Sequence, residues 1–153
     1  MKRRIGWMLG LGALLMVTGC SQSETGIALL DEPAADADSI DVGAGPLEAD
    51  AWQGADPESV RFVAEHDGVT YYLAEPRDPE LAGGLCLTVV EPGAMACGGP
   101  SQGAPADAAV LILDYGTGAA AVFRDGDDTS ELADQGWTQV HPNLLVRDSG
   151  PTA

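Results

Sequence analysis

Every second position is apolar over residues 60–65, at Val60, Phe62 and Ala64, and again over residues 69–74, at Val69, Tyr71 and Leu73. A period of two is what a half-buried strand requires. Asp67-Gly68 lies between the two segments and is typical of a two-residue type I′ hairpin turn. That turn pairs position 64 with 71 and position 62 with 73. The register predicts one shared apolar face, made of Phe62, Ala64, Tyr71 and Leu73.

Further short strands are expected downstream, separated by turns that contain Gly or Pro. They cover residues 85–90, 95–98, 109–113 and 119–123, and a final strand over 137–146 that is broken at Pro142. Residues 109–113 are apolar throughout, as expected for a strand covered on both faces. Proline within the last strand predicts an edge position or a bulge.

Short helices are expected over residues 78–82 and 131–135, each ended by glycine. The pattern therefore predicts a mostly β fold, a small antiparallel sheet with one or two short helices. We assign it to a domain over residues 59–147, which is near the lower size limit for a self-sufficient core. Residues 148–153 are predicted to be a disordered tail.

Residues 20–58 have the composition of a disordered linker. From residue 21 onward they hold ten acidic residues, no basic ones and many Ala, Gly, Ser and Pro. Such a segment buries too little apolar surface to offset its ordering entropy. As a flexible coil it would span roughly 30–35 Å. Residues 27–30 and Trp52 are the apolar exceptions, and Trp52 is a candidate for docking on the domain.

The first residues have the pattern of an export signal. Lys2, Arg3 and Arg4 precede an apolar segment over residues 5–17. Thirteen residues are too few to cross the hydrocarbon core, which needs about 20. A basic start, a short apolar core and small residues before a cleavage point predict a signal peptide over residues 1–19.

The run Val17-Thr18-Gly19-Cys20 resembles the lipobox of bacterial lipoproteins. The resemblance implies that Cys20 is diacylated on its sulfur, by fatty acids such as palmitate, and becomes the first residue after cleavage. The chain would then be anchored at the extracytoplasmic face of the cell membrane, where two acyl chains hold firmly. The alternatives are an ordinary signal peptide, or an uncleaved anchor with an incidental cysteine.

A second resemblance involves the domain. The order Tyr-Tyr-Leu-Ala, Leu-Cys-Leu, Ala-Cys-Gly and then Asn143 is similar to small exported lipoproteins of actinobacteria, and so is the abundance of Ala, Gly and Asp. Those families are mostly uncharacterised. The likeness therefore implies a lineage and no activity.

The charge of the chain excludes one class of partner. After removal of residues 1–19, four arginines and no lysine remain against 24 acidic residues, a side-chain charge of −20. Nucleic-acid binding requires basic groups that neutralise phosphates. Peripheral adhesion to an anionic bilayer is also disfavoured, so contact with the membrane would depend on the lipid on Cys20. The acidity keeps an exported protein soluble, or attracts cations or a basic partner.

With Cys20 lipidated, Cys86 and Cys97 are left as a pair. An exported location permits a disulfide. A regular hairpin would set Cys86 opposite residue 98 or 99, so the bridge requires a bulge or a looser turn. Metal binding and redox chemistry are the alternatives. The spacing is too wide for a Cys-x-x-Cys motif, and no further ligands complete a zinc site.

The sequence contains no recognisable catalytic motif. It has no Gly-x-Ser-x-Gly and no dinucleotide-binding fingerprint. His66 and His141 are the only histidines, and a shared metal site between them remains an alternative to two unrelated side chains. An EF-hand loop that began at Asp125 would need Gly at its sixth position and Glu at its twelfth, where this chain has Ser130 and Gly136, which leaves a looser calcium site or a solvated turn over residues 125–128.

We therefore expect a lipid-anchored extracytoplasmic protein that is not an enzyme and uses no cofactor or metal. Its expected role is that of a binding or interaction module of the cell envelope, with an unidentified envelope protein as partner. The alternative is an envelope enzyme, or an accessory subunit, with an acidic site assembled from scattered carboxylates. A third possibility is a purely structural envelope component.

Overall fold

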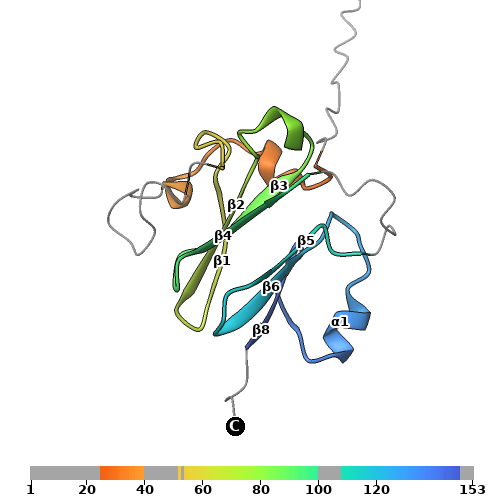
Figure 1. The fold of residues 1–153 in the computed structure, drawn as a ribbon. Coiled ribbons are helices and arrows are strands. Elements are labelled where there is room, and N and C mark those ends of the chain that lie inside the picture. The colour runs from red at the N-terminus through yellow and green to blue at the C-terminus, as the bar shows by residue number, and fades with distance from the viewer. Residues whose placement is uncertain (1–24, 40–51, 53, 100–107, 149–153) are drawn as a thin grey trace, which may run out of the picture.

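Eight strands form two four-stranded antiparallel sheets in the computed structural model, which describes residues 25–39, 52, 54–99 and 108–148 (Figure 1). The first sheet has the order β1 (Arg61–His66), β2 (Val69–Ala74), β3 (Leu85–Val89) and β4 (Ala94–Gly98). The second has the order β5 (Leu111–Asp114), β6 (Gly118–Val122), β8 (Leu144–Asp148) and β7 (Thr138–His141). The predicted mostly β fold is confirmed, with two sheets where one was expected.

The helical elements are short. They are the α-helix α1 (Ser130–Asp134) and the 3₁₀ turns η1 (Ala28–Asp31), η2 (Asp36–Asp38) and η4 (Pro79–Leu81). Helices at α1 and η4 were expected from the sequence, whereas η1 and η2 fall in the range predicted to be a linker.

The two sheets pack face to face around one apolar core. Leu73 of β2, Leu87 of β3, Val122 of β6 and Leu144 of β8 all belong to it and are fully buried. The edges of the sheets also approach each other, because β4 lies against β5 and β1 lies against β7. Tyr71 of β2 and Tyr115 of the turn between β5 and β6 join the two sheets, because their hydroxyls form a hydrogen bond of 2.9 Å.

The hairpin of β1 and β2 forms at the predicted turn, but its apolar face differs from the prediction. Asp67 and Gly68 both have positive φ, 51° and 79°, as a type I′ turn requires. Ala64 pairs with Tyr71 as expected. A bulge then shifts the register, so that Phe62 pairs with Tyr72. The prediction that Phe62 faces the core is therefore wrong.

The bulge changes which side chain of β1 enters the core. Val63 is buried there beside Ala64. Phe62 instead packs edge-on against Tyr72 on the outer face of the first sheet, with 5.8 Å between the ring centroids. An extra residue between two paired positions reverses the facing of every residue beyond it.

The hairpin of β3 and β4 has the looser turn that the cysteine pair requires. Val89 pairs with Ala94, so four residues, 90–93, form the connection. This register sets Cys86 directly opposite Cys97.

The second sheet departs from the predicted strands at two places. Ile112 of β5 is 58% exposed because β5 is an edge strand, so the prediction that this segment is covered on both faces is wrong. The single broken strand predicted over 137–146 is a hairpin, with Pro142 in the turn between β7 and β8. The edge position and the bulge that Pro142 suggested are both present, in β7.

Small side chains let the second sheet be covered on both faces. Every residue of β6, Gly-Ala-Ala-Ala-Val, is buried. Ala120 and Val122 face the shared core. Ala119 and Ala121 face outward, under Trp137 and next to Leu132 of α1. A strand buried on both faces reads as a continuous apolar run, and here alanine leaves room for the indole ring.

Residues 25–39 are part of the folded domain, although they lie in the range predicted to be a disordered linker. Ile27 is fully buried and Leu30 is 6% exposed, both in the core that the two sheets line. The guanidinium group of Arg61 in β1 donates to the Glu32 carbonyl from two nitrogens, at 2.9 and 2.7 Å. The folded part therefore begins before residue 59, the predicted boundary.

The same segment also covers the edge of the first sheet. Asp38 accepts a hydrogen bond from the backbone nitrogen of Phe62 at 2.6 Å. An edge strand presents unpaired backbone groups that can recruit another chain. The Asp38 carboxylate satisfies one such group on the edge strand β1, the backbone nitrogen of Phe62.

We expect Ile27→Ala to lower the free energy of unfolding by about 2–4 kcal/mol, because it removes a fully buried side chain and leaves a cavity. Urea unfolding of the chain from residue 21 onward measures this change. Ile112→Ala is the matched control, since the side chain is exposed, and should cost about 0.5 kcal/mol or less. Equal, small effects would mean that residues 25–39 are not part of the fold.

Candidate functional site

The start of the described chain is bonded to the loop that follows β6 of the second sheet. The predicted signal peptide and the predicted lipidation site Cys20 lie outside the described residues. The carbonyl of Gly26 accepts from the backbone nitrogen of Asp125 at 2.9 Å, and the nitrogen of Ala28 donates to the Asp125 carboxylate at 2.7 Å. The Arg124 side chain lies against Gly26.

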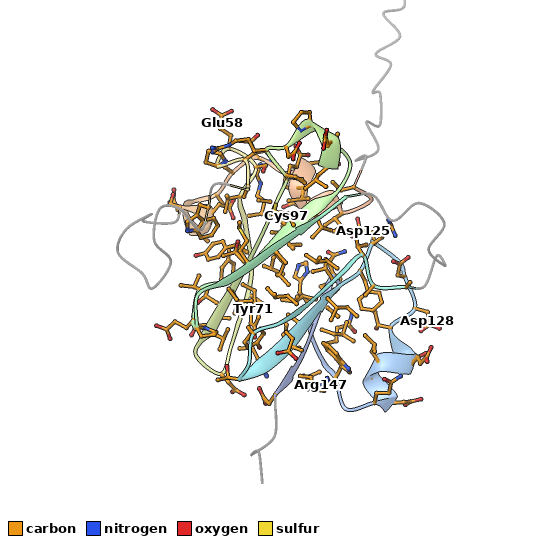
Figure 2. All side chains as sticks on the ribbon, viewed as in Figure 1. Glu58, Tyr71, Cys97, Asp125, Asp128 and Arg147 are labelled. Carbon is orange, nitrogen blue, oxygen red and sulfur yellow. A yellow bond between two sulfur atoms is a disulfide. The ribbon has the colours of Figure 1, made fainter. Side chains whose placement is uncertain are left out.

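This attachment point lies at one end of the sandwich. The turns η1 and η4 are at that end, and the turn between β1 and β2 and the end of β8 are at the other (Figure 1). Glu58 and Arg147 mark the same two ends in Figure 2. Any group attached shortly before residue 25 is therefore close to the η1–η4 end.

The acidic loop over residues 125–128 uses its carboxylates within the protein. Besides Ala28, Asp125 accepts from the side-chain amide of Asn143 at 2.6 Å. Asp127 accepts from the backbone nitrogen of Arg124, and Asp128 from that of Ser130. Over residues 25–39, 52, 54–99 and 108–148, no three His, Cys, Asp or Glu side chains are grouped so that they could hold a metal ion. The loop has the bonding of a structural turn.

The two histidines lie at opposite ends of the sandwich and do not share a site. His66 is the last residue of β1, beside the turn to β2, and its Nε2 is 3.5 Å from the Asp67 carboxylate. His141 ends β7 beside the turn to β8. Its Nδ1 accepts a hydrogen bond from the backbone nitrogen of Asn143 at 3.2 Å.

Burial lowers the pKa of His141, and the carboxylates of Asp125 and Glu32 oppose this shift only in part. The acceptor role of Nδ1 also requires that nitrogen to be unprotonated. His141 is therefore neutral in the folded protein at pH 7.

The structure contains the predicted disulfide between Cys86 and Cys97, on the outer face of the first sheet. Closing a loop of this size stabilises the fold by roughly 2–4 kcal/mol. Trp52 and Gly54 pack against it. Trp52 is 8% exposed and belongs to one apolar cluster with Cys86 and Cys97, which confirms the expectation that it docks on the domain. Gly54 lies so close to the bridge that a Cβ there would meet Cys97 Sγ at 3.2 Å.

A shallow pocket of about 370 Å³ lies between α1 and the edge of β5. Ile112, Phe123 and Leu132 supply its apolar lining, and Asp128 and Glu131 its acidic rim. The hydrogen bonds from Ser130 lower the pKa of Asp128. A carboxyl group that acts as a general acid near neutral pH needs the opposite shift. Nothing in the sequence indicated this pocket, because the apolar segment that contains Ile112 was predicted to be covered on both faces.

We expect Trp52→Ala to speed reduction of the Cys86–Cys97 disulfide by dithiothreitol several-fold, because thiol–disulfide exchange depends on access to the sulfurs. Thiol labelling over time measures the rate. Trp137→Ala is the matched control, since it removes the tryptophan that covers the other sheet. If the disulfide is reduced equally fast in both variants, the reaction is limited by general unfolding of the domain and not by the packing of Trp52 over the disulfide.

We expect His141 to make the protein less stable in mild acid. Its folded pKa lies below the unfolded value of about 6.5. The unfolded chain therefore binds more protons, and stability present above pH 6.5 is lost as the pH falls toward the folded pKa.

Urea unfolding between pH 7.5 and pH 5 measures this loss. His141→Gln should flatten the profile in that range, and the control Ile112→Ala, which changes an exposed side chain and no titratable group, should keep the decline of the native protein. A profile that His141→Gln leaves unchanged would contradict the assignment.

No helix in the part of the chain that the structure describes is long and apolar enough to cross a bilayer. Comparisons of the chain with protein-family models, with curated proteins and with solved structures each gave no match. The function is therefore inferred from the residues of this chain alone.

Proposed function

We propose that the chain is a lipid-anchored extracytoplasmic protein whose β-sandwich acts as a binding module of the cell envelope. The observation that carries the proposal is the run Val17-Thr18-Gly19-Cys20 at the end of a basic and then apolar segment. Cys20 becomes the diacylated first residue, and its two acyl chains hold the protein in the membrane. The proposed location of the protein is the extracytoplasmic face of the cell membrane.

The disulfide supports an exported location. Cys86 and Cys97 are bonded to each other. Disulfides persist in oxidising compartments and are rare where thiols are kept reduced. Because these two cysteines pair with each other, Cys20 is the one thiol of the chain left for acylation.

The use of the polar side chains favours binding over catalysis. In the loop over residues 125–128, all three carboxylates accept hydrogen bonds from this chain's own groups. The Arg61 guanidinium donates to the backbone carbonyl of Glu32. The Arg147 guanidinium stacks on Trp137, 4.7 Å from the centre of the ring. These groups are committed to the fold. The charge of −20 after removal of the signal peptide favours a protein partner with a basic surface over nucleic acid.

The second candidate is an envelope enzyme or accessory subunit with an acidic site. The pocket beside α1 is where Asp128 and Glu131 would form that site. The lowered pKa of Asp128 argues against its acting as a proton donor there.

We expect the mature protein to begin at Cys20 and to carry a diacyl lipid. Intact-mass measurement of the protein extracted from bacterial membranes tests both points in one spectrum. Cys20→Ala should abolish the added lipid mass, and Cys97→Ala should leave it in place. A mature chain that begins elsewhere, or an unmodified Cys20, would overturn the proposed anchor.

The binding role has a separate test. Crosslinking on intact cells should repeatedly recover the same envelope protein with the lipidated chain, and the yield should fall when Cys20→Ala removes the lipid. Repeated recovery of nothing would contradict the interaction role and leave the anchor untouched.

A further inference from the structure

The position at which the chain enters the fold is close in sequence to the proposed lipid. Residue 25 is already part of the domain, and Ile27 two residues later is fully buried. Four residues separate Cys20 from Thr25. Whatever conformation they adopt, five steps along a fully extended chain span at most about 18 Å. A flexible linker over residues 21–58 would instead have given a span of roughly 30–35 Å.

The entry segment is fastened in a way that keeps this tether short. Ala28 and Gly26 both bond to Asp125, at 2.7 and 2.9 Å. Arg61 holds the Glu32 carbonyl a few residues later. Lengthening the tether would require breaking these bonds and bringing Ile27 and Leu30 out of the core.

The two ends of the sandwich are consequently unequal in their distance from the lipid. The η1–η4 end contains the entry segment and the turn at Pro79–Leu81 (Figure 1). The other end carries the turns between β1 and β2 and between β5 and β6. Strands of five or six residues separate the two ends by roughly 17–20 Å. This difference is as large as the whole reach of the tether.

Electrostatic attraction does not set the orientation. The exposed charged side chains near η4 are Glu75, Arg77, Asp78 and Glu80, which are acidic in sum. An anionic bilayer repels them weakly, because charges more than about 8 Å apart are largely screened at physiological ionic strength. Covalent reach is the constraint that decides which end is near the lipid.

We infer that the lipid on Cys20 holds the domain with its η1–η4 end against the membrane surface and its β1–β2 and β5–β6 turns directed away from it. This inference rests on the proposed lipidation. It assigns the η1–η4 end as a membrane-facing surface, and it leaves the opposite end as the surface that another envelope component can approach.

Energy transfer from single positions to the bilayer tests the orientation. The lipidated full chain carries a donor dye on Glu80→Cys or on Thr117→Cys, both exposed positions, at the η4 turn and at the β5–β6 turn. Each protein is placed in phosphatidylcholine vesicles that contain an acceptor dye on a lipid headgroup. Transfer should be clearly stronger from position 80 than from position 117.

A long-tether variant is the matched control. Twenty Gly and Ser residues inserted after Ser23 add a coil of about 25 Å, longer than the separation of the two ends. The domain can then turn over, and transfer from the two positions should become nearly equal. A difference that survives the insertion would mean that something other than reach orients the domain, which overturns the inference.

The remaining outcomes separate the inference from the proposed function. Equal or reversed transfer, in a protein that floats with the vesicles, overturns the orientation and leaves the lipid anchor intact. A protein that has its native Cys20 but does not float with the vesicles shows that the proposed anchor is wrong, and the orientation fails with it. The same labelled chain with Cys20→Ala should show no transfer from either position.

Discussion

The structure depends on the burial of Ile27 between the two sheets. That side chain belongs to the core to which β2, β3, β6 and β8 all contribute. Asp125 fastens the segment through its carboxylate and its backbone nitrogen, and Asn143 ties the same carboxylate to the turn of β7 and β8. Without this segment the sandwich would lose two core side chains, in a domain that is already small. Its seating also limits the length of chain between the domain and Cys20.

Each sheet is covered on its outer face by one tryptophan. Trp52 lies over the disulfide of the first sheet, and Trp137 lies over the alanines of β6 in the second. Aromatic rings bury a large apolar area each, which suits a chain in which only 5% of the residues are aromatic. Because these two tryptophans cover the outer faces of the sheets, strands such as β3 and β6 are buried at every position.

Local signals in the sequence predicted local structure well. Asp67-Gly68 determines its hairpin because only a few dipeptides adopt positive φ twice. The pairing of Cys86 with Cys97 followed from the cysteine count. The bulge in β1 left no such signal, because both Phe62 and Val63 are apolar and either could have faced inward. Residues 25–39 were missed because Ile27 and Leu30 are few among many acidic residues, and their burial depends on Arg61 and Asp125, distant partners that composition does not reveal.

Of the proposed membrane attachment, the sequence predicts only the residue that carries the lipid, Cys20. The motif at Cys20 is a local feature of the sequence, whereas the proposed orientation of the domain follows from where the chain enters the fold, which only the structure shows. Amide hydrogen exchange at Ala28 and Leu30 tests that entry most directly, because both nitrogens donate hydrogen bonds in the folded segment. If residues 25–39 are part of the folded domain, both amides should be protected nearly as well as that of Val122 in β6. Exchange at the rate of an unstructured peptide would contradict that placement.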